Sequence, residues 1–299
     1  MMPSEAENAK TDDTLKEVHE VLFDMMSDID KFCKRHNLRY WIFCGTLLGA
    51  VREHNFIPWD DDADITLPVE DYRKFCRLAQ QELSDKYVIQ TPGNTPQHPW
   101  LWTRVYRKGT TFLRWDRANQ KICHGIALDV YPMIGVAKTR RGFMLQRAIL
   151  TLSSALHRVE FWRAQGYPPN KWTRLSGKLL MLVPEPLRRA LSVGLLRLAS
   201  LSPKRTRRCC TIDLSPLLPK FKSRYLNFHT TLELAGKKFA APKNYHIMLI
   251  HMYGPYYMTP PPETARNGHR ARLGGVVIDA KRDYTEYLKE RAEQSARKE

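Results

Sequence analysis

Four aspartates fall within the five residues from Asp60 to Asp64, in the stretch Trp59-Asp-Asp-Asp-Ala-Asp-Ile65. Side chains on an extended segment alternate between two faces, so Asp62 and Asp64 point the same way and can offer carboxylate oxygens to one divalent cation. Without a cation, acids this close together repel one another strongly. A surface turn is the alternative, because Asp-rich runs are common in turns. We expect a metal site, with Asp60 and Asp61 in supporting or structural positions.

A Gly-Thr pair, Gly45-Thr46, precedes Asp62 by 16 residues. Glycine permits close approach of a ligand, and a turn that leads into a helix presents backbone N–H groups, so this pair is expected to contact a phosphate. The alternative is a plain turn between a strand and a helix. Arg52 is a candidate for a bidentate contact with phosphate or with one of the acids. Together these features indicate a metal-dependent transferase that acts on a nucleotide-linked phosphate.

A third acid, Asp129, stands alone in the otherwise apolar segment Ile126–Tyr131. A buried carboxylate needs a partner, which would be a core arginine or a shared metal ion. We expect Asp129 to lie beside the Asp pair, where it would bind metal or take the proton from an attacking hydroxyl. Arg104, on the predicted strand 102–107, is a weaker candidate for binding the charge of a leaving group.

These segments resemble the LicD family, which contains bacterial phosphorylcholine transferases and is related to the fukutin-type ribitol-phosphate transferases. The resemblance rests on the blocks Gly45–Arg52 with Ile57–Ile65, His124–Pro132 and Phe239–Pro262, in that order. It covers about residues 30–136 and 225–269. Three ordered blocks form a specific signal, whereas Asp-x-Asp alone would be weak.

The resemblance implies a nucleotidyltransferase-like α/β (α+β) fold, a mixed sheet with flanking helices. It implies Mg²⁺, with Mn²⁺ as a substitute, at Asp62, Asp64 and Asp129. It further implies transfer of phosphocholine from CDP-choline to a hydroxyl of a cell-surface glycan or lipid-linked glycan precursor, with release of CMP. Ribitol or glycerol phosphate stays open as the transferred group. Aromatic faces bind quaternary ammonium by cation–π attraction. Trp59, Trp102 and Tyr131 are therefore candidates for binding choline, although ordinary core aromatics would look the same.

Two other functions fit parts of the sequence. A nucleotidyltransferase would use the same acids but attack the phosphorus next to the nucleoside. A noncatalytic nucleic-acid-binding protein is suggested by the net charge of +17. The retained acids argue against it, because they would repel a phosphate backbone in the absence of metal, so we do not expect nucleic acid as a partner.

Composition limits the class of protein. The chain has 299 residues, of which 43% are hydrophobic, enough for one large or two small domains. No apolar stretch approaches the ~18–20 residues that span a bilayer, and the N-terminal residues are too polar for a signal peptide. The six cysteines include no CxxC pair, so we expect reduced thiols and a cytoplasmic protein. The related ribitol-phosphate transferases bind zinc through cysteines, but Cys209-Cys210 lacks evident partner ligands here.

The periodicity of the sequence predicts an alternation of helices and strands that would position these residues. We expect helices at 14–36 and 70–83, a helical turn at 46–51, and strands at 40–44, 62–67, 87–91, 101–107, 110–114 and 126–131. Lys108-Gly109 is expected to close a hairpin between the strands 101–107 and 110–114. We divide the chain into a catalytic core at 11–136, a basic amphipathic helical insertion at 137–210, a segment at 211–275 that packs back on the core, and a charged tail at 276–299.

The insertion holds most of the charge. Between Ala137 and Cys210, 16 Lys and Arg stand against Glu160 and Glu185, an excess of +14. Apolar residues recur there at helical spacing, in the stripes Leu145, Ile149, Leu152, Leu156 and Val159, and Leu187, Leu191, Leu195 and Leu198. Either the stripes pack on the core and the charge is solvated, or the insertion rests on the anionic inner face of the cytoplasmic membrane, where each cation contributes ~1 kcal/mol.

Overall fold

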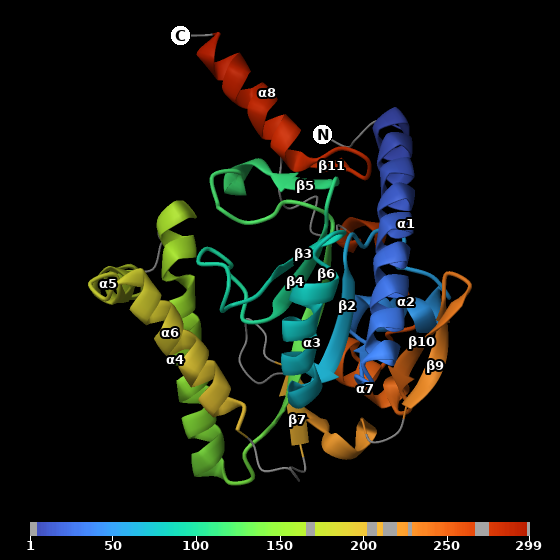
Figure 1. Cartoon of the computed structure of the whole chain (residues 1–299). Helices are drawn as coiled ribbons and strands as arrows, with labels where there is room; N and C mark the ends of the chain where they lie inside the picture. Colours follow the sequence, from blue (N-terminus) through green and yellow to red (C-terminus); the bar gives the residue numbers. More distant parts are fainter. Residues whose placement is uncertain are drawn as a thin grey trace.

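The computed structural model describes residues 5–165, 171–201, 208–211, 220–226, 229–266 and 275–297 (Figure 1). Its centre is a mixed sheet in the order β1-β2-β6-β4-β3. These strands are β1 (Trp41–Ile42), β2 (Ala63–Pro68), β6 (Ala127–Gly135), β4 (Thr103–Arg107) and β3 (Tyr87–Gln90). β2 and β6 are parallel, and the other neighbours in this order are antiparallel. The mixed α/β fold expected from the sequence is confirmed.

Two helices bury their apolar stripes against the sheet. α1 (Glu5–Arg35) and α3 (Val69–Glu82) contact β6, and α3 also contacts β2 and β3. In α1, Leu22, Met25, Ile29 and Phe32 recur at helical spacing and are at most 1% exposed. Because these side chains fill the main core, the strands beneath them are held in fixed positions.

A second group of elements surrounds the β1–β2 edge of the sheet. α2 (Cys44–Arg52) contacts β2, α7 (Tyr245–Tyr253) and β9 (His229–Leu234), and β9 forms a hairpin with β10 (Lys237–Pro242). Three short 3₁₀ turns complete this part of the chain and the region near the sheet: η1 (Trp115–Arg117), η2 (Ser223–Tyr225) and η3 (Glu263–Ala265). The segment after the insertion therefore packs back on the core through β9, β10 and α7.

The insertion is helical where it is described. It contains α4 (Arg140–Gln165), α5 (Lys171–Leu180) and α6 (Glu185–Ala199), and Figure 1 shows α4 and α6 side by side at the edge of the molecule. After α6 the chain returns to the sheet as β7 (Arg208–Thr211), which pairs with the end of β6 and with β8 (Lys220–Lys222). None of the described helices combines the length and the apolar character needed to cross a membrane.

One expectation about the strands is wrong. β5 (Thr111–Arg114) pairs with β11 (Val276–Asp279) instead of forming a hairpin with β4. The Lys108-Gly109 turn is present, but the backbone amides of Arg107 and Phe112 donate to Ile126 and His124, so the segment before β6 separates the two strands. Residues 276–297 are also more than a charged tail, because they form β11 and α8 (Tyr284–Ala296).

Candidate active site

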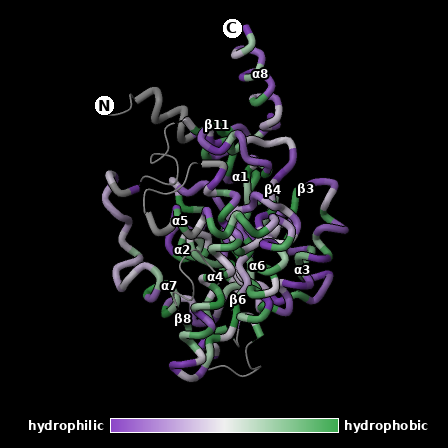
Figure 2. The backbone as a smooth tube through the Cα atoms, turned by 90° about the vertical axis from the view of Figure 1, so that its left-hand side faces the viewer, coloured by the Kyte–Doolittle hydropathy of each residue, from purple (hydrophilic) through white to green (hydrophobic). Residues whose placement is uncertain are grey.

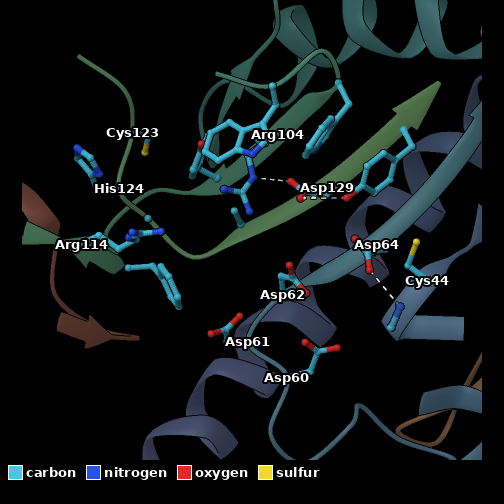
Figure 3. A pocket seen from close by; sticks show the side chains of 18 of the residues that line it. Cys44, Asp60, Asp61, Asp62, Asp64, Arg104, Arg114, Cys123, His124 and Asp129 are labelled. Atoms are coloured by element: carbon cyan, nitrogen blue, oxygen red, sulfur yellow. Dashed lines mark hydrogen bonds and ion pairs between the residues drawn. The ribbon is translucent and has the colours of Figure 1, made fainter. Parts of the chain in front are cut away.

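Three carboxylates from two parallel strands meet at one point. The register of β2 and β6 places Asp64 directly beside Asp129, and Asp62 lies one residue before β2. One oxygen of each of these three side chains lies within 4.8 Å of the others. Figure 3 shows the three labelled side chains gathered where the two strands meet. The side chains that were expected to converge therefore do so. Their metal-binding and catalytic roles stay predictions.

The crowding of these acids has an electrostatic consequence. Asp64 is 6% exposed and Asp129 is 4% exposed. Burial, followed by the nearby carboxylates of Asp62, Asp129 and Asp60, raises the pKa of Asp64 well above its usual range. A bound divalent cation would remove this repulsion, because it supplies the positive charge that the cluster lacks. Asp60, Asp61 and Asp62 form a second group of carboxylates within 4.8 Å of one another.

The beginning of α2 holds Asp64 in place. The Gly45 amide donates to Oδ2 of Asp64 at 3.2 Å, and the hydroxyl of Thr46 accepts from the Asp64 amide at 2.8 Å. A Cβ at position 45 would lie 2.4 Å from Oδ2 of Asp60, so a side chain there would displace the Asp60 carboxylate. Thr46 is buried and Gly45 lines the cleft. The structure thus gives this pair a supporting role toward Asp64, and its contact with phosphate stays a prediction.

Asp129 has a cationic neighbour as well as acidic ones. Arg104 of β4 is its partner in the antiparallel register and forms an ion pair with it at 2.5 Å. Burial alone would lower the pKa of Arg104, but Asp129, Tyr106 and Asp62 raise it overall, so the guanidinium stays charged. The guanidinium also lies 4.3 Å from the centroid of the Trp100 ring. Both partners considered for Asp129, a core arginine and the acid pair, are therefore present.

These groups line a cleft of about 650 Å³. Asp60, Asp61, Asp62, Asp64 and Asp129 contribute acids, and Figure 3 shows Arg114 and His124 at a distance from them, on the far side of Arg104. Aromatic and arginine side chains complete the lining: Trp59, Trp100, Trp102, Arg104, Tyr106, Phe112, Arg114, Arg117, Tyr131 and Tyr253. A cleft with an acidic region and a basic region suits a ligand that carries phosphates together with a metal ion.

The three candidate aromatic residues all line this cleft but do not form one group. The rings of Trp102 and Tyr131 are 5.0 Å apart, next to Asp129. Trp59 has two arginines over its ring, Arg52 at 5.6 Å and Arg266 at 5.1 Å. Since cations already occupy positions at Trp59, the pair Trp102–Tyr131 is the better placed for a ligand.

Arg52 does not line the cleft. Its guanidinium pairs with Glu53 at 2.6 Å and donates to the carbonyl of Tyr257 at 3.3 Å. These contacts join α2 to the loop after α7 and shape the region around Trp59. The geometry offers no support for the phosphate contact expected of Arg52.

Two arginines were missed by reasoning from the sequence. Arg114 and Arg117 flank Trp115 at the end of β5 and line the cleft. Arg117 lies over the rings of Trp100 and Phe161, and burial, followed by repulsion from Arg114, lowers its pKa to about 10. The stretch Arg-Trp-Asp-Arg at 114–117 was the only available signal, because aromatic residues interleaved with arginine often bind anions.

Comparison with known proteins agrees with this geometry. Residues 37–168 match the family described as LicD/FKTN/FKRP, nucleotidyltransferase domain. This match contains every acid of the cleft together with Arg104, Arg114 and Arg117. This part of the chain is a LicD-family domain.

Several known proteins resemble this chain to different extents. The lipopolysaccharide cholinephosphotransferase LicD of Haemophilus influenzae is 23% identical over 269 residues, which cover 86% of this chain and 96% of that protein. An uncharacterized protein of Rickettsia typhi is 43% identical over 111 residues, 37% of this chain and 33% of its own length. An uncharacterized protein of Rickettsia prowazekii is 48% identical over 50 residues, 17% of this chain and 19% of its own. The similarity to the Haemophilus protein thus extends beyond the LicD domain.

Proposed function

We propose that this protein is a phosphotransferase that moves a substituted phosphate, phosphocholine in the first instance, from a CDP-linked donor to a hydroxyl of a glycan. The observation that carries the proposal is the convergence of Asp62, Asp64 and Asp129 in the wall of a cleft that also holds arginines and aromatic rings. The similarity to a lipopolysaccharide cholinephosphotransferase along most of the chain supports the choice of phosphocholine and of a surface glycan as acceptor.

The acid cluster fits a divalent cation. Hard oxygen ligands are what Mg²⁺ prefers, and the pKa of Asp64 is raised by its burial and by the nearby carboxylates of Asp62, Asp129 and Asp60. We infer that Asp62, Asp64 and Asp129 would hold Mg²⁺, for which Mn²⁺ can substitute. When bound, the metal would neutralise the charge of the donor's pyrophosphate.

Residues of the chain would transfer the proton and bind the phosphates and the ammonium group. An acceptor oxygen forms a bond to the distal phosphorus of the donor, the bond from that phosphorus to the bridging oxygen breaks, and CMP leaves with the electron pair. The proton of the acceptor hydroxyl goes to a carboxylate of the cluster, for which Asp129 is our candidate. Arg104 and Arg117 would bind phosphate oxygens, because each carries a fixed positive charge into the cleft. Trp102 and Tyr131 would receive the quaternary ammonium.

The direct test is incubation of purified protein with Mg²⁺, a set of CDP-linked donors and candidate glycans. We expect CMP release with CDP-choline that rises when the acceptor is added and stops when EDTA removes the metal. Release with CDP-ribitol or CDP-glycerol instead would keep the reaction class and change the transferred group. Product analysis separates the rival reaction, since a nucleotidyltransferase attaches the nucleotide to the acceptor and frees no CMP. Salt-dependent binding of nucleic acid without any turnover would reject the proposal.

A further inference from the structure

The helices of the insertion leave an unusual number of large apolar side chains in solvent. In the described part of the chain, ten of the fourteen exposed large hydrophobic residues lie between Met144 and Leu201. They are Met144, Leu145, Leu152, Leu175, Leu179, Leu182, Leu187, Leu191, Leu198 and Leu201. Leu145 is 63% exposed and Leu201 is 69% exposed. A concentration of exposed apolar side chains on one part of a protein is characteristic of an interaction surface.

Six of these residues form two stripes, one on α4 and one on α6 and just after it. On α4, Arg141, Leu145, Ala148 and Leu152 follow one another at spacings of four, three and four residues, and all are exposed. On α6 and just after it, Leu187, Leu191, Gly194, Leu198 and Leu201 repeat the pattern and are also exposed. We call these two stripes the outer face of the insertion. Figure 2 looks from the side of the molecule on which Figure 1 shows α4 and α6.

The inward sides of the same helices explain why the exposed stripes point outward. Leu150 of α4 is fully buried, and Ala199 of α6 packs with Leu150 against the core. Between the helices, Ser153 donates to the backbone carbonyl of Ser192 at 2.8 Å. Because the core side and the shared side are occupied, the stripes lie on the remaining side of each helix. Of the two alternatives for the stripes, packing on the core does not hold for Leu145 and Leu152 of α4, nor for the α6 leucines Leu187, Leu191 and Leu198, which are exposed.

The charge around the outer face has one sign. Arg140, Arg141, Arg147, Arg163 and Arg197 are exposed on α4 and α6. The two acids of the insertion are already paired, Glu160 with Arg188 and Glu185 with Arg189. Arg188, the partner of Glu160, is only 3% exposed. The outer face therefore combines apolar side chains with unneutralised positive charge.

We propose that the outer face binds the surface of an anionic lipid bilayer. An anionic bilayer binds both kinds of side chain, because its headgroups attract the arginines and its apolar interior accommodates the leucines. A nucleic acid would satisfy only the arginines. A second copy of this chain would bring arginines against arginines, because the face carries the same charge on both copies.

The location of the outer face links it to the cleft. The opposite side of α4 supplies Phe161, whose ring lies 5.2 Å from the guanidinium of Arg117 in the cleft lining. A bilayer bound to the insertion would thus be one helix diameter away from the active-site arginines. The identification of the acceptor as a lipid-linked glycan presented at that surface rests on the proposed function. The binding of lipid by the outer face does not depend on the proposed function.

Co-sedimentation with vesicles tests the proposal on the full-length protein. Vesicles of phosphatidylcholine with 30% phosphatidylglycerol are compared with pure phosphatidylcholine at low and high salt. We expect binding to the anionic vesicles alone, weakening as salt rises. Each cation contributes about fivefold to partitioning, so Arg141→Gln, Arg147→Gln and Arg197→Gln together should lower it ~100-fold. The matched control changes three exposed cations of α3, Arg73, Lys74 and Arg77, to Gln and should lower it less than fivefold.

A second variant tests the apolar part. Leu145→Gln, Leu187→Gln and Leu191→Gln together should weaken binding to anionic vesicles at least tenfold while circular dichroism and thermal midpoint stay unchanged. Equal binding of the wild type to neutral vesicles, no binding to anionic vesicles at low salt, or a wild-type dimer that these leucine changes dissociate would overturn the proposal. CMP release with a water-soluble acceptor is measured in parallel. If the wild type releases no CMP with that acceptor, the proposed function is rejected, whether or not the protein binds vesicles.

Discussion

At the scale of the residue, the site depends on carboxylates that repel one another. We predict that Asp64→Asn lowers turnover ~10²-fold or more, because one anionic metal ligand is lost. The same change should leave the metal-free protein as stable as the wild type or more stable, since it removes a crowded charge. The rise in thermal midpoint on adding Mg²⁺ should become smaller. Asp85→Asn, at an exposed position outside the cleft, is the matched control and should change none of these.

Asp129 permits a finer test, since its two proposed roles predict different data. If it binds metal, Asp129→Asn should raise the Mg²⁺ concentration needed for half-maximal activity. If it accepts the proton, the rate should fall while that concentration stays the same. An unchanged rate together with an unchanged Mg²⁺ requirement would remove Asp129 from the site.

Arg104 and Asp129 should also be coupled in stability. Arg104→Gln leaves the buried carboxylate of Asp129 without its cation and should cost about 3–5 kcal/mol in the free energy of unfolding. Adding Asp129→Asn to that variant should recover part of the loss, because the unpaired charge disappears. A double-mutant cycle by urea unfolding measures the coupling, and additive losses would show that the two side chains act independently.

At the scale of the element, sequence reasoning succeeded where a periodicity is strong. The alternation of strand side chains placed Asp62 and Asp64 together, and an isolated acid in an apolar strand pointed to Asp129. It failed for β11, because Val276–Asp279 is only four residues long and its partner β5 is far away in sequence. Arg114 and Arg117 were missed for the same reason: they reach the cleft from η1 and the end of β5, and no local pattern predicts where a distant strand will hold them.

Gln146 supplies a prediction at the same scale, because it joins the insertion to the sheet. Its side-chain oxygen accepts from the Ala137 amide at 3.0 Å, and its nitrogen donates to the carbonyls of Gly135 and Ala199 at 2.9 Å each. Gln146→Ala should cost about 2–3 kcal/mol in the free energy of unfolding, because buried backbone groups lose their partners. Gln81→Ala, at an exposed position of α3, should change it by less than about 0.5 kcal/mol. Similar urea midpoints for the two variants would contradict this role.

At the scale of the whole molecule, two buried histidines connect the catalytic core to the insertion. The rings of His98 and His157 are 6.3 Å apart, and His157 belongs to α4. Burial lowers the pKa of His98 to about 3 and that of His157 to about 4. In the unfolded chain both would titrate near ~6.5. The unfolded chain therefore binds more protons below pH ~6.5, and stability falls as the pH drops from ~6.5 toward ~4.

The predicted slope is about 1.4 kcal/mol per pH unit for each histidine over this window. His98→Gln keeps a donor for the Trp102 carbonyl, which lies 2.7 Å from Nε2 of His98, and removes one titrating group. Urea unfolding at pH 7, 6 and 5 gives the free energy of unfolding at each pH. Its change per pH unit should be smaller in the variant by the contribution of one titrating histidine. A slope identical to that of the wild type would mean that His98 already holds a proton in the folded protein.

The chain leaves the sheet for the insertion and returns to it at two positions that are joined by one backbone hydrogen bond. The Val136 amide donates to the carbonyl of Arg208 at 2.8 Å, where β6 ends and β7 begins. Whatever lies between these two residues can therefore be lengthened, shortened or exchanged without a shift of register in the strand that carries Asp129. Core side chains such as Val69 and Leu101 would lose their cover, and His98 would lose its contact with His157. We expect Val136 and Arg208 to be suitable positions for replacing the insertion. A different pair of helices placed between them would let the same catalytic sheet bind to another surface.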